Sequence, residues 1–255
     1  MQYHEFGSSN SEVILLLHGG GLSWWSFREA AEYLQQNYRV ILPILDGHGG
    51  SDRPFTTIED NASEIIGFID EHFGGSVLLL GGLSLGAQVA LEMLSQRGSI
   101  CRFALIESAA VIPSQLTRAL IGPAFGSSYG LIRNRRFAQL QFRSLRMKPE
   151  LFEEYYRDTC RIAKADMIAF MKAATGFSPK ETLRGCSAQV HVFAGARENR
   201  EILSSAEAIH RVLPQGTLNI LPGLYHGEFS INHAREYADK AASILEQGEA
   251  CGERC

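Results

Sequence analysis

The chain has 255 residues, of which 45% are hydrophobic and 20% charged, and its formal net charge is −4. This composition is typical of a globular protein with enough apolar residues for a buried sheet. The weakly acidic balance gives no electrostatic reason to expect a nucleic-acid partner. No apolar run reaches the roughly 18–20 residues of a membrane helix, and the first residues, MQYHEF, do not resemble a secretory signal. We therefore expect no membrane span.

The cysteines do not suggest a disulfide framework or a metal site. There are five, an odd number, and they are mostly dispersed, which fits a reducing cytoplasm. Cys251 and Cys255 lie in the terminal stretch EACGERC, with no second ligand pair nearby. No H-E-x-x-H motif occurs either. The sequence predicts a cytoplasmic protein, and none of its motifs calls for a metal.

Short apolar runs alternate with amphipathic segments along most of the chain. The runs are rich in Val, Ile and Leu and are continuous, as expected of strands buried on both faces. They are Val13–Leu17, Val40–Leu42, Val77–Leu80, Arg102–Ile106, Val190–Phe193 and Leu218–Leu221. Helices are expected over residues 24–36, 58–73, 84–96, 200–213 and 232–247. This alternation predicts an α/β fold with a mostly parallel sheet flanked by helices.

The alternation stops after Ile106 and resumes near Val190. Residues 112–180 contain no convincing strand, and the run that follows Pro149 has apolar residues at helical spacing. This segment holds twelve basic and five acidic residues, a charge of +7, which leaves −11 for the rest of the chain. We interpret residues 112–180 as a helical cap, or lid, inserted between late strands. The predicted core is then residues 1–111 and 181–255.

The strongest motif is Gly82-Leu83-Ser84-Leu85-Gly86, which matches G-x-S-x-G. A predicted strand ends directly before it, and a predicted helix follows at once. A nucleophile on such a tight turn has a strained backbone, and side chains two residues away on either side would collide. The pattern predicts that Ser84 is a nucleophile.

A second glycine-rich turn follows the first predicted strand, in His18-Gly19-Gly20-Gly21. Glycines there allow backbone N–H groups to approach a substrate oxygen. The N–H groups of Gly20 and Leu85 are predicted to form an oxyanion hole, although Gly21 remains an alternative to Gly20. The spacing is not that of a nucleotide-binding loop, and no Walker lysine follows.

The base and the acid are expected on loops after late strands. His226 lies in LNILPGLYHGEF, just after the last predicted strand, which suits a general base. The turn after Val190–Phe193 offers Glu198 as the acid that orients this histidine. Glu107, directly after an earlier strand, is the alternative acid.

The motifs HGGG, DGHGGSD, GLSLG, GARENRE and GLYHGEF, in that order, resemble the α/β-hydrolase superfamily, and most closely its small capped bacterial esterase-like serine hydrolases. The resemblance implies an eight-stranded, mostly parallel sheet, with the serine turn after the fifth strand and a lid between the sixth and seventh. It also implies hydrolytic chemistry without a cofactor. Ser84, His226, Gly20 and Leu85 match the family's functional positions, and Glu198 departs from its usual aspartate. Asp46 matches an aspartate that is normally structural.

The predicted function is hydrolysis of a small-molecule carboxylic ester or thioester through an acyl-enzyme. Two alternatives remain. Cap arginines that faced the pocket would favour a carbon–carbon bond hydrolase or a lyase acting on an anionic substrate. A non-catalytic ligand-binding protein on this scaffold is the other alternative. Trp24, Trp25 and Phe27 are expected either to wall the acyl pocket or to pack at a helix start. The sequence does not predict the oligomeric state.

Overall fold

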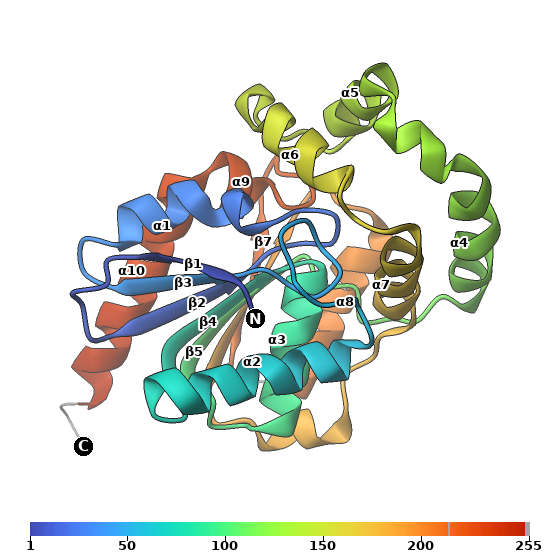
Figure 1. Ribbon diagram of the computed structural model, residues 1–255. Helices are drawn as coiled ribbons and strands as arrows, with labels where there is room; N and C mark the ends of the chain where they lie inside the picture. The colour runs from blue at the N-terminus through green and yellow to red at the C-terminus, as the bar shows by residue number, and fades with distance from the viewer. Residues whose placement is uncertain (214, 253–255) are drawn as a thin grey trace.

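The computed structural model describes residues 1–213 and 215–252, apart from the side chains of residues 127, 128 and 249–252. One twisted sheet runs through the molecule (Figure 1). Its strands are β1 (Tyr3–Phe6), β2 (Val13–Leu17), β3 (Arg39–Pro43), β4 (Val77–Leu83), β5 (Cys101–Glu107), β6 (Gln189–Gly195) and β7 (Thr217–Leu221). The order across the sheet is β1-β3-β2-β4-β5-β6-β7, and β1 alone among these strands is antiparallel to its neighbour.

The predicted α/β class and mostly parallel sheet are confirmed, and each of the six predicted strands lies within an observed strand. The expected count of eight strands is wrong, because the described residues form seven. The serine turn therefore follows the fourth strand, and the helical insertion follows the fifth. Strand β1 escaped the sequence analysis because an edge strand needs no continuous apolar run, and its residues are exposed or half-buried.

Helices cover both faces of the sheet (Figure 1). Helices α2 (Ile58–Phe73), α3 (Leu85–Gln96) and α8 (Arg200–Val212) pack on one face, and α1 (Arg28–Leu34), α9 (Glu228–Asn232) and α10 (Ala234–Gly252) pack on the other. A short 3₁₀ helix, Trp24–Phe27, precedes α1, so the predicted helix over 24–36 begins in this form. Strand β2 shows why the strands are apolar throughout. Leu15 and Leu17 belong to one core, whereas Ile14 and Leu16 belong to the other.

The segment between β5 and β6 contains helices and no strand among its described residues, as predicted. Its elements are α4 (Gln115–Ser128), α5 (Arg135–Ser144), α6 (Phe152–Thr159) and α7 (Lys164–Gly176), with 3₁₀ turns at Tyr129–Arg133, Pro149–Leu151 and Glu181–Gly185. The helical run after Pro149 is broken between α6 and α7. In Figure 1 these helices arch over one end of the sheet. We call residues 112–180 the helical insertion.

Both ends of the helical insertion are fixed to α3, the helix that begins directly after Ser84. Gln88 is buried, and its Nε2 donates to the carbonyl oxygen of Ala110 at 2.6 Å and to that of Ala174 at 2.9 Å. One amide therefore holds the backbone where the chain enters the insertion and where it leaves α7.

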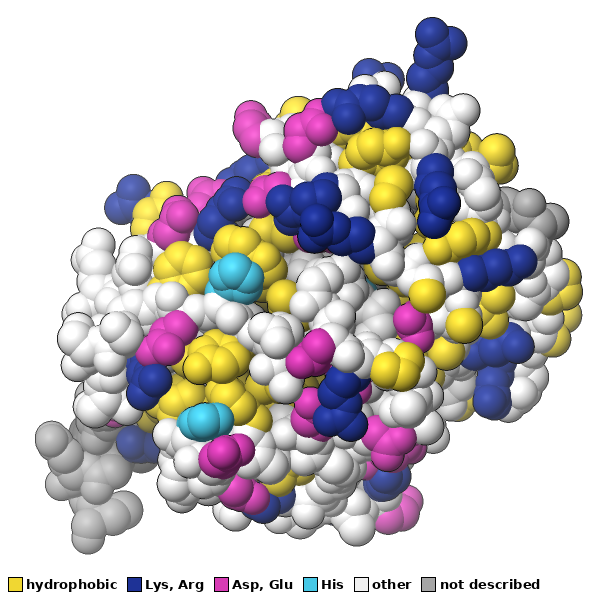
Figure 2. Space-filling view, viewed as in Figure 1, with side chains coloured by type: hydrophobic (Ala, Val, Ile, Leu, Met, Phe, Trp, Pro, Cys, Tyr) yellow, Lys and Arg dark blue, Asp and Glu magenta, His cyan; other side chains and the backbone are white. Residues whose placement is uncertain are grey.

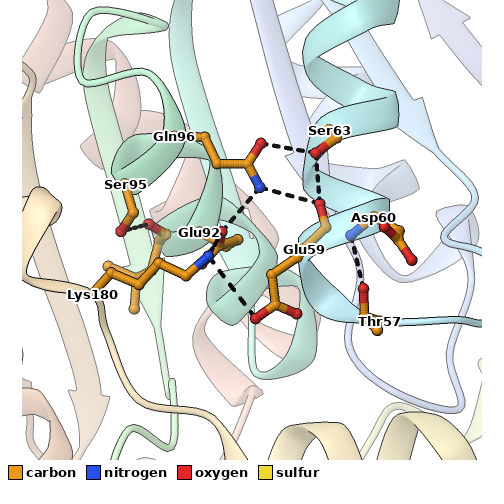
Figure 3. Close-up of polar contacts among 9 residues, drawn as sticks. Thr57, Glu59, Asp60, Ser63, Glu92, Ser95, Gln96 and Lys180 are labelled. Carbon is orange, nitrogen blue, oxygen red and sulfur yellow. Dashed lines mark hydrogen bonds and ion pairs between the residues drawn. The ribbon is translucent and has the colours of Figure 1, made fainter.

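A polar cluster lies one turn further along α3 (Figure 3). The buried carboxylate of Glu92 accepts from Lys180 Nζ at 2.5 Å and from Gln96 Nε2 at 2.9 Å. Gln96 also bonds Ser63 of α2. The last residue of the helical insertion is thus tied to α3, which in turn is tied to α2.

No helix in the described part of the chain is both long and apolar enough to cross a lipid bilayer.

Candidate active site

Ser84 lies in the sharp turn between β4 and α3. Its φ is 54° and its ψ −112°, a combination that costs energy for a residue with a side chain. The turn is held in place because Ser84 N–H donates to the carbonyl of Glu107 at 2.9 Å, while the Ser84 carbonyl accepts from Gln88 N–H. The strained backbone is therefore over-determined by its neighbours, as expected for a residue with a chemical role.

The glycines on either side of Ser84 are required by close backbone contacts. A methyl group on Gly82 would lie 2.5 Å from the backbone of Gly86, and one on Gly86 would lie 2.1 Å from the carbonyl oxygen of Leu17. Neither contact is possible for a real side chain. This confirms the steric argument from the sequence, because the turn brings α3 directly against β2 and β4.

His226 lies on the loop after β7 and meets Glu198, which lies on the loop after β6. The distance between His226 Nδ1 and Glu198 Oε2 is 2.7 Å. The two loops are held together by backbone bonds from Ala196 N–H to Leu221 and from Arg197 N–H to Leu224. The Glu198 side chain is only 1% exposed, whereas that of His226 is 48% exposed. Glu198 thus holds the imidazole at Nδ1, while much of the rest of the ring is exposed.

The carboxylate of Glu198 has two further donors. Its Oε1 accepts from Gly195 N–H and from Ser108 Oγ, both at 2.8 Å. Burial acts to raise the pKa of Glu198, but the hydrogen bond and charge of His226, followed by the bonds from Gly195 and Ser108, bring it below its ordinary value. This carboxylate is therefore ionised at neutral pH.

Ser108 was missed by the sequence analysis, which considered only Glu107 at the end of β5. The φ of Ser108 is 57°, and the N–H of Ser108 donates to the carbonyl of Phe193. The sequence signal that could have identified Ser108 as a site residue is a short polar side chain directly after a buried strand.

Glu107, the alternative acid, occupies a different position. It is buried, and its Oε1 accepts from Ser230 N–H at 3.3 Å. Burial raises the pKa of Glu107 to about 7. Its other oxygen has no hydrogen-bond partner among the described residues, and neither has the hydroxyl of Ser230 nor that of Tyr237. The hydrogen bond to His226 is made by Glu198.

The glycine-rich turn after β2 is held by neutral histidines. His18 Nδ1 bonds the carbonyl of Gly19, and its Nε2 accepts from Leu45 N–H. Burial lowers the pKa of His18 to about 3 and that of His48 to about 4. His48 bonds the carbonyl of Asp46, as expected for a loop-fixing side chain.

Gly20 approaches the start of α3. A methyl group on Gly20 would lie 3.6 Å from Leu85 Cβ, whereas one on Gly21 would meet no atom within 4 Å. Leu85 is the first residue of α3, so its N–H has no partner within the helix. Of the two glycines considered from sequence, Gly20 is the one packed against Leu85.

Ser84 and His226 line the same cavity, which has a volume of about 350 Å³. Gly20 and Leu85 line it as well, and the helical insertion supplies mainly apolar side chains, among them Phe170 and Met171. No lysine or arginine is found among its described lining residues. The cavity is therefore suited to a neutral, largely apolar molecule.

The aromatic residues after the glycine turn do not line this cavity. Trp25 is buried and donates from Nε1 to Asp158 Oδ2 of α6 at 2.9 Å, Phe27 lies in the core beside Tyr237, and Trp24 stacks on His4. Of the two expectations, packing at the helix start is correct and walling of the acyl pocket is wrong. Of the three rings, Trp25 ties the helical insertion to the core through its bond to Asp158.

A larger and more open hollow of about 560 Å³ lies at the other end of the strands. It is lined by residues such as Asn10, Arg39 and Ser99, which precede or begin strands. Ligands of open α/β sheets bind at the carboxyl ends of the strands, so the smaller cavity is the candidate site. No cluster of three or more potential metal ligands occurs within the part of the chain that the structure describes, and the side chains of Cys251 and Cys255 lie outside it.

The family model described as "Alpha/beta hydrolase family" matches residues 14–240. Among curated proteins, a 45-residue segment is 51% identical to the magnesium-chelatase 30 kDa subunit of Rhodobacter capsulatus; it covers 18% of this chain and 16% of that relative. The curated relatives that head the comparison are each matched over less than a third of their own length.

Solved structures match over nearly the whole chain. A thermophilic esterase from Thermogutta terrifontis is 20% identical with a TM-score of 0.78, and the match covers 96% of this chain and 93% of that one. A meta-cleavage product hydrolase from Pseudomonas fluorescens IP01 is also 20% identical, with a TM-score of 0.75 and coverage of 97% and 94%. At these identities the likeness establishes the fold.

Proposed function

Because this chain belongs to the alpha/beta hydrolase family, we propose that it hydrolyses a neutral small-molecule carboxylic ester or thioester, with Ser84 as nucleophile, His226 as base and Glu198 as the orienting acid. One observation carries the proposal. A strained serine and a histidine anchored by a buried carboxylate border the same apolar cavity. Such an arrangement activates a hydroxyl for attack on a carbonyl carbon.

The proposed reaction has two displacements. His226 takes the proton of Ser84 as its oxygen attacks the carbonyl, and the N–H groups of Gly20 and Leu85 hold the oxyanion. When the intermediate collapses, His226 returns that proton to the leaving alcohol or thiol. Water then attacks the acyl-enzyme with the same histidine as base, which releases the acid and restores Ser84.

Glu198 keeps the imidazole in the correct tautomer. A carboxylate bonded to Nδ1 requires a proton there, which leaves Nε2 free to accept the proton of Ser84. Because Ser108 and Gly195 occupy Oε1, only Oε2 is directed at the histidine. Burial of Glu198 also strengthens its interaction with the imidazolium that forms during attack.

The helical insertion is proposed to act as a cap over this site. It supplies most of the apolar lining of the cavity and thereby limits the size of the acyl group. The alternative of an anionic substrate relied on arginines that faced the pocket. The described lining contains none, so no observation favours a carbon–carbon hydrolase or a lyase that would bind such a substrate.

The test is labelling with a fluorophosphonate, which reacts with activated serines, together with turnover of p-nitrophenyl esters of graded chain length. We expect the native chain to be labelled and Ser84→Ala to lose both labelling and turnover. Ser204→Ala is the matched control, because Ser204 is exposed on α8, away from the cavity. Labelling that persisted in Ser84→Ala would contradict the proposal. A folded native chain that is never labelled would favour the ligand-binding alternative.

A further inference from the structure

The net positive charge of the helical insertion comes from its first half. From Ser108 to Pro149 the sequence has seven lysines and arginines and no aspartate or glutamate. The same stretch holds seven of the ten large exposed hydrophobic side chains in the described part of the chain. They are Ile112, Leu116, Leu120, Leu131, Phe137, Leu140 and Leu145.

These two kinds of side chain share the outer surface of α4 and α5. In α5, Arg136, Leu140 and Arg143 lie on one face at helical spacing, whereas Ala138 and Phe142 on the other face are buried. Leu140 is 68% exposed. Figure 2 shows hydrophobic and basic side chains interleaved over the upper right of the molecule, where α4 and α5 lie.

Helix α4 also exposes apolar side chains on one face, but it carries fewer basic residues than α5. Leu116 and Leu120 are four residues apart, so they project from the same face, and they are 75% and 57% exposed. Side chains this exposed contribute almost nothing to the core. Isolated leucines are common on surfaces, but seven large exposed apolar side chains within one segment are more than scattered exposure explains, and they suggest a partner.

Most charges on this surface have no counter-charge among the described residues. In the described part of the chain, Arg133, Arg136 and Arg143 form no ion pair, although their neighbours Arg135 and Lys148 pair with Glu153 and Glu29. None of the three lines the cavity. A surface with unneutralised arginines between protruding leucines is complementary to a partner that is both anionic and apolar.

We propose that the outer surface formed by α4, the 3₁₀ turn Tyr129–Arg133 and α5 docks on an anionic lipid bilayer. Leucines enter the boundary between headgroups and acyl chains, and arginines bind the lipid phosphates. Their long side chains allow the guanidinium to stay at headgroup level while the stem contacts apolar atoms. A nucleic acid would satisfy the arginines but would leave the leucines in water, so the lipid surface accounts for both.

The docked surface adjoins the cavity. Leu145 is 40% exposed and also lines the cavity, as do Gln141 of α5 and Met147. An apolar ester dissolved in the bilayer would then reach Ser84 without crossing bulk water. This second step rests on the proposed function, whereas the docking itself does not.

The test is sedimentation with vesicles of phosphatidylcholine alone and of phosphatidylcholine with about a quarter of phosphatidylglycerol. The full chain carries Ser84→Ala, so binding is measured without turnover and a failed hydrolase proposal would leave it unaffected. We expect binding to the anionic vesicles, weakened by salt, and little binding to the neutral ones. The triple variant Arg133→Gln, Arg136→Gln, Arg143→Gln should bind weaker by roughly fivefold for each arginine removed.

A matched control removes three exposed charges elsewhere, with Arg200→Gln, Arg211→Gln and Lys240→Gln on α8 and α10. It changes net charge equally and should bind like the parent. Leu116→Ser with Leu120→Ser should weaken binding even at low salt. The proposal is overturned if the parent binds neither vesicle, if both triple variants bind equally, or if the leucine variant binds like the parent. Circular dichroism spectra show whether each variant is folded.

Discussion

The loops at the carboxyl ends of the strands and the outer helices of the insertion differ in whether their charged side chains are buried and paired. In the loops, Glu198 is almost fully buried and each of its oxygens has fixed partners. On α5, Arg136 and Arg143 are exposed and form no ion pair among the described residues. Buried charges must be paired, and exposed ones need not be. The loops are therefore built to fix one geometry, whereas the outer helices are free to meet a partner.

The largest effect should come from breaking the loop network at its acid. Glu198→Gln keeps the size of the side chain but removes the charge that selects the tautomer of His226. We expect kcat for p-nitrophenyl acetate to fall by about 10⁴. Glu107→Gln is the matched control and should lower kcat by less than about tenfold, because Glu107 bonds Ser230 rather than His226. If Glu107→Gln lowered kcat more than Glu198→Gln, Glu107 and not Glu198 would be the acid that orients His226.

The buried carboxyl of Glu107 should make stability depend on pH. Burial raises its pKa from 4.5 to about 7, so between these values the folded chain holds a proton that the unfolded chain has released. The native chain should therefore lose stability relative to Glu107→Gln as pH rises from 4.5 through 7, by up to roughly 3 kcal/mol. Urea unfolding of both proteins across this range measures the difference. A difference that is independent of pH would contradict the assignment.

The attachment of the insertion to α3 should matter less, but measurably. Gln88→Met leaves the partly buried carbonyls of Ala110 and Ala174 without their side-chain donor, which should cost about 1–3 kcal/mol in the free energy of unfolding. Gln247→Met is the control, because Gln247 bonds Ser243 on an exposed part of α10. Its effect should stay within about 0.5 kcal/mol. Equal effects in the two variants would show that Gln88 does not hold the insertion.

The smallest effect should come from the outer helices. Removing the charges of Arg133, Arg136 and Arg143 breaks no ion pair among the described residues, so the free energy of unfolding should change by no more than about 0.5 kcal/mol. Turnover of a short, water-soluble ester should stay the same, since none of the three lines the cavity. A marked loss of stability or of turnover would show that these arginines serve the fold or the active site, and the contrast between paired loop charges and free outer charges would not hold.

Much of the architecture could be predicted because it depends on local patterns. Six strands could be recognised as apolar runs, five of them mostly buried, and the strand-turn-helix around Ser84 follows from two glycines that the structure shows to be sterically required. The edge strand Tyr3–Phe6 could not be predicted in this way, because half-exposed residues carry no such pattern. The expected eight strands came from a resemblance rather than from the residues, and that count was wrong.

The residues of the candidate site also differ in how far the sequence could predict them. Motif and position were enough to nominate Ser84 and His226, because each follows a strand end that the sequence reveals. They left Gly20 and Gly21 as alternatives. They were not enough to choose between Glu198 and Glu107, since both follow strands whose ends meet at the same edge of the sheet. The structure separates them by their partners: His226 for one, the backbone of Ser230 for the other.

The sequence by itself determined the α/β class, the turn that carries Ser84 and the excess of basic residues in the insertion, because periodicity, glycine spacing and charge are properties of the chain. Only the tertiary structure decided which carboxylate meets the histidine, that Trp25 packs against α6 instead of lining the cavity, and that the arginines of α5 face outward. These outcomes depend on how segments distant in sequence approach one another. Such contacts are set by packing and by the pairing of buried polar groups over the whole molecule.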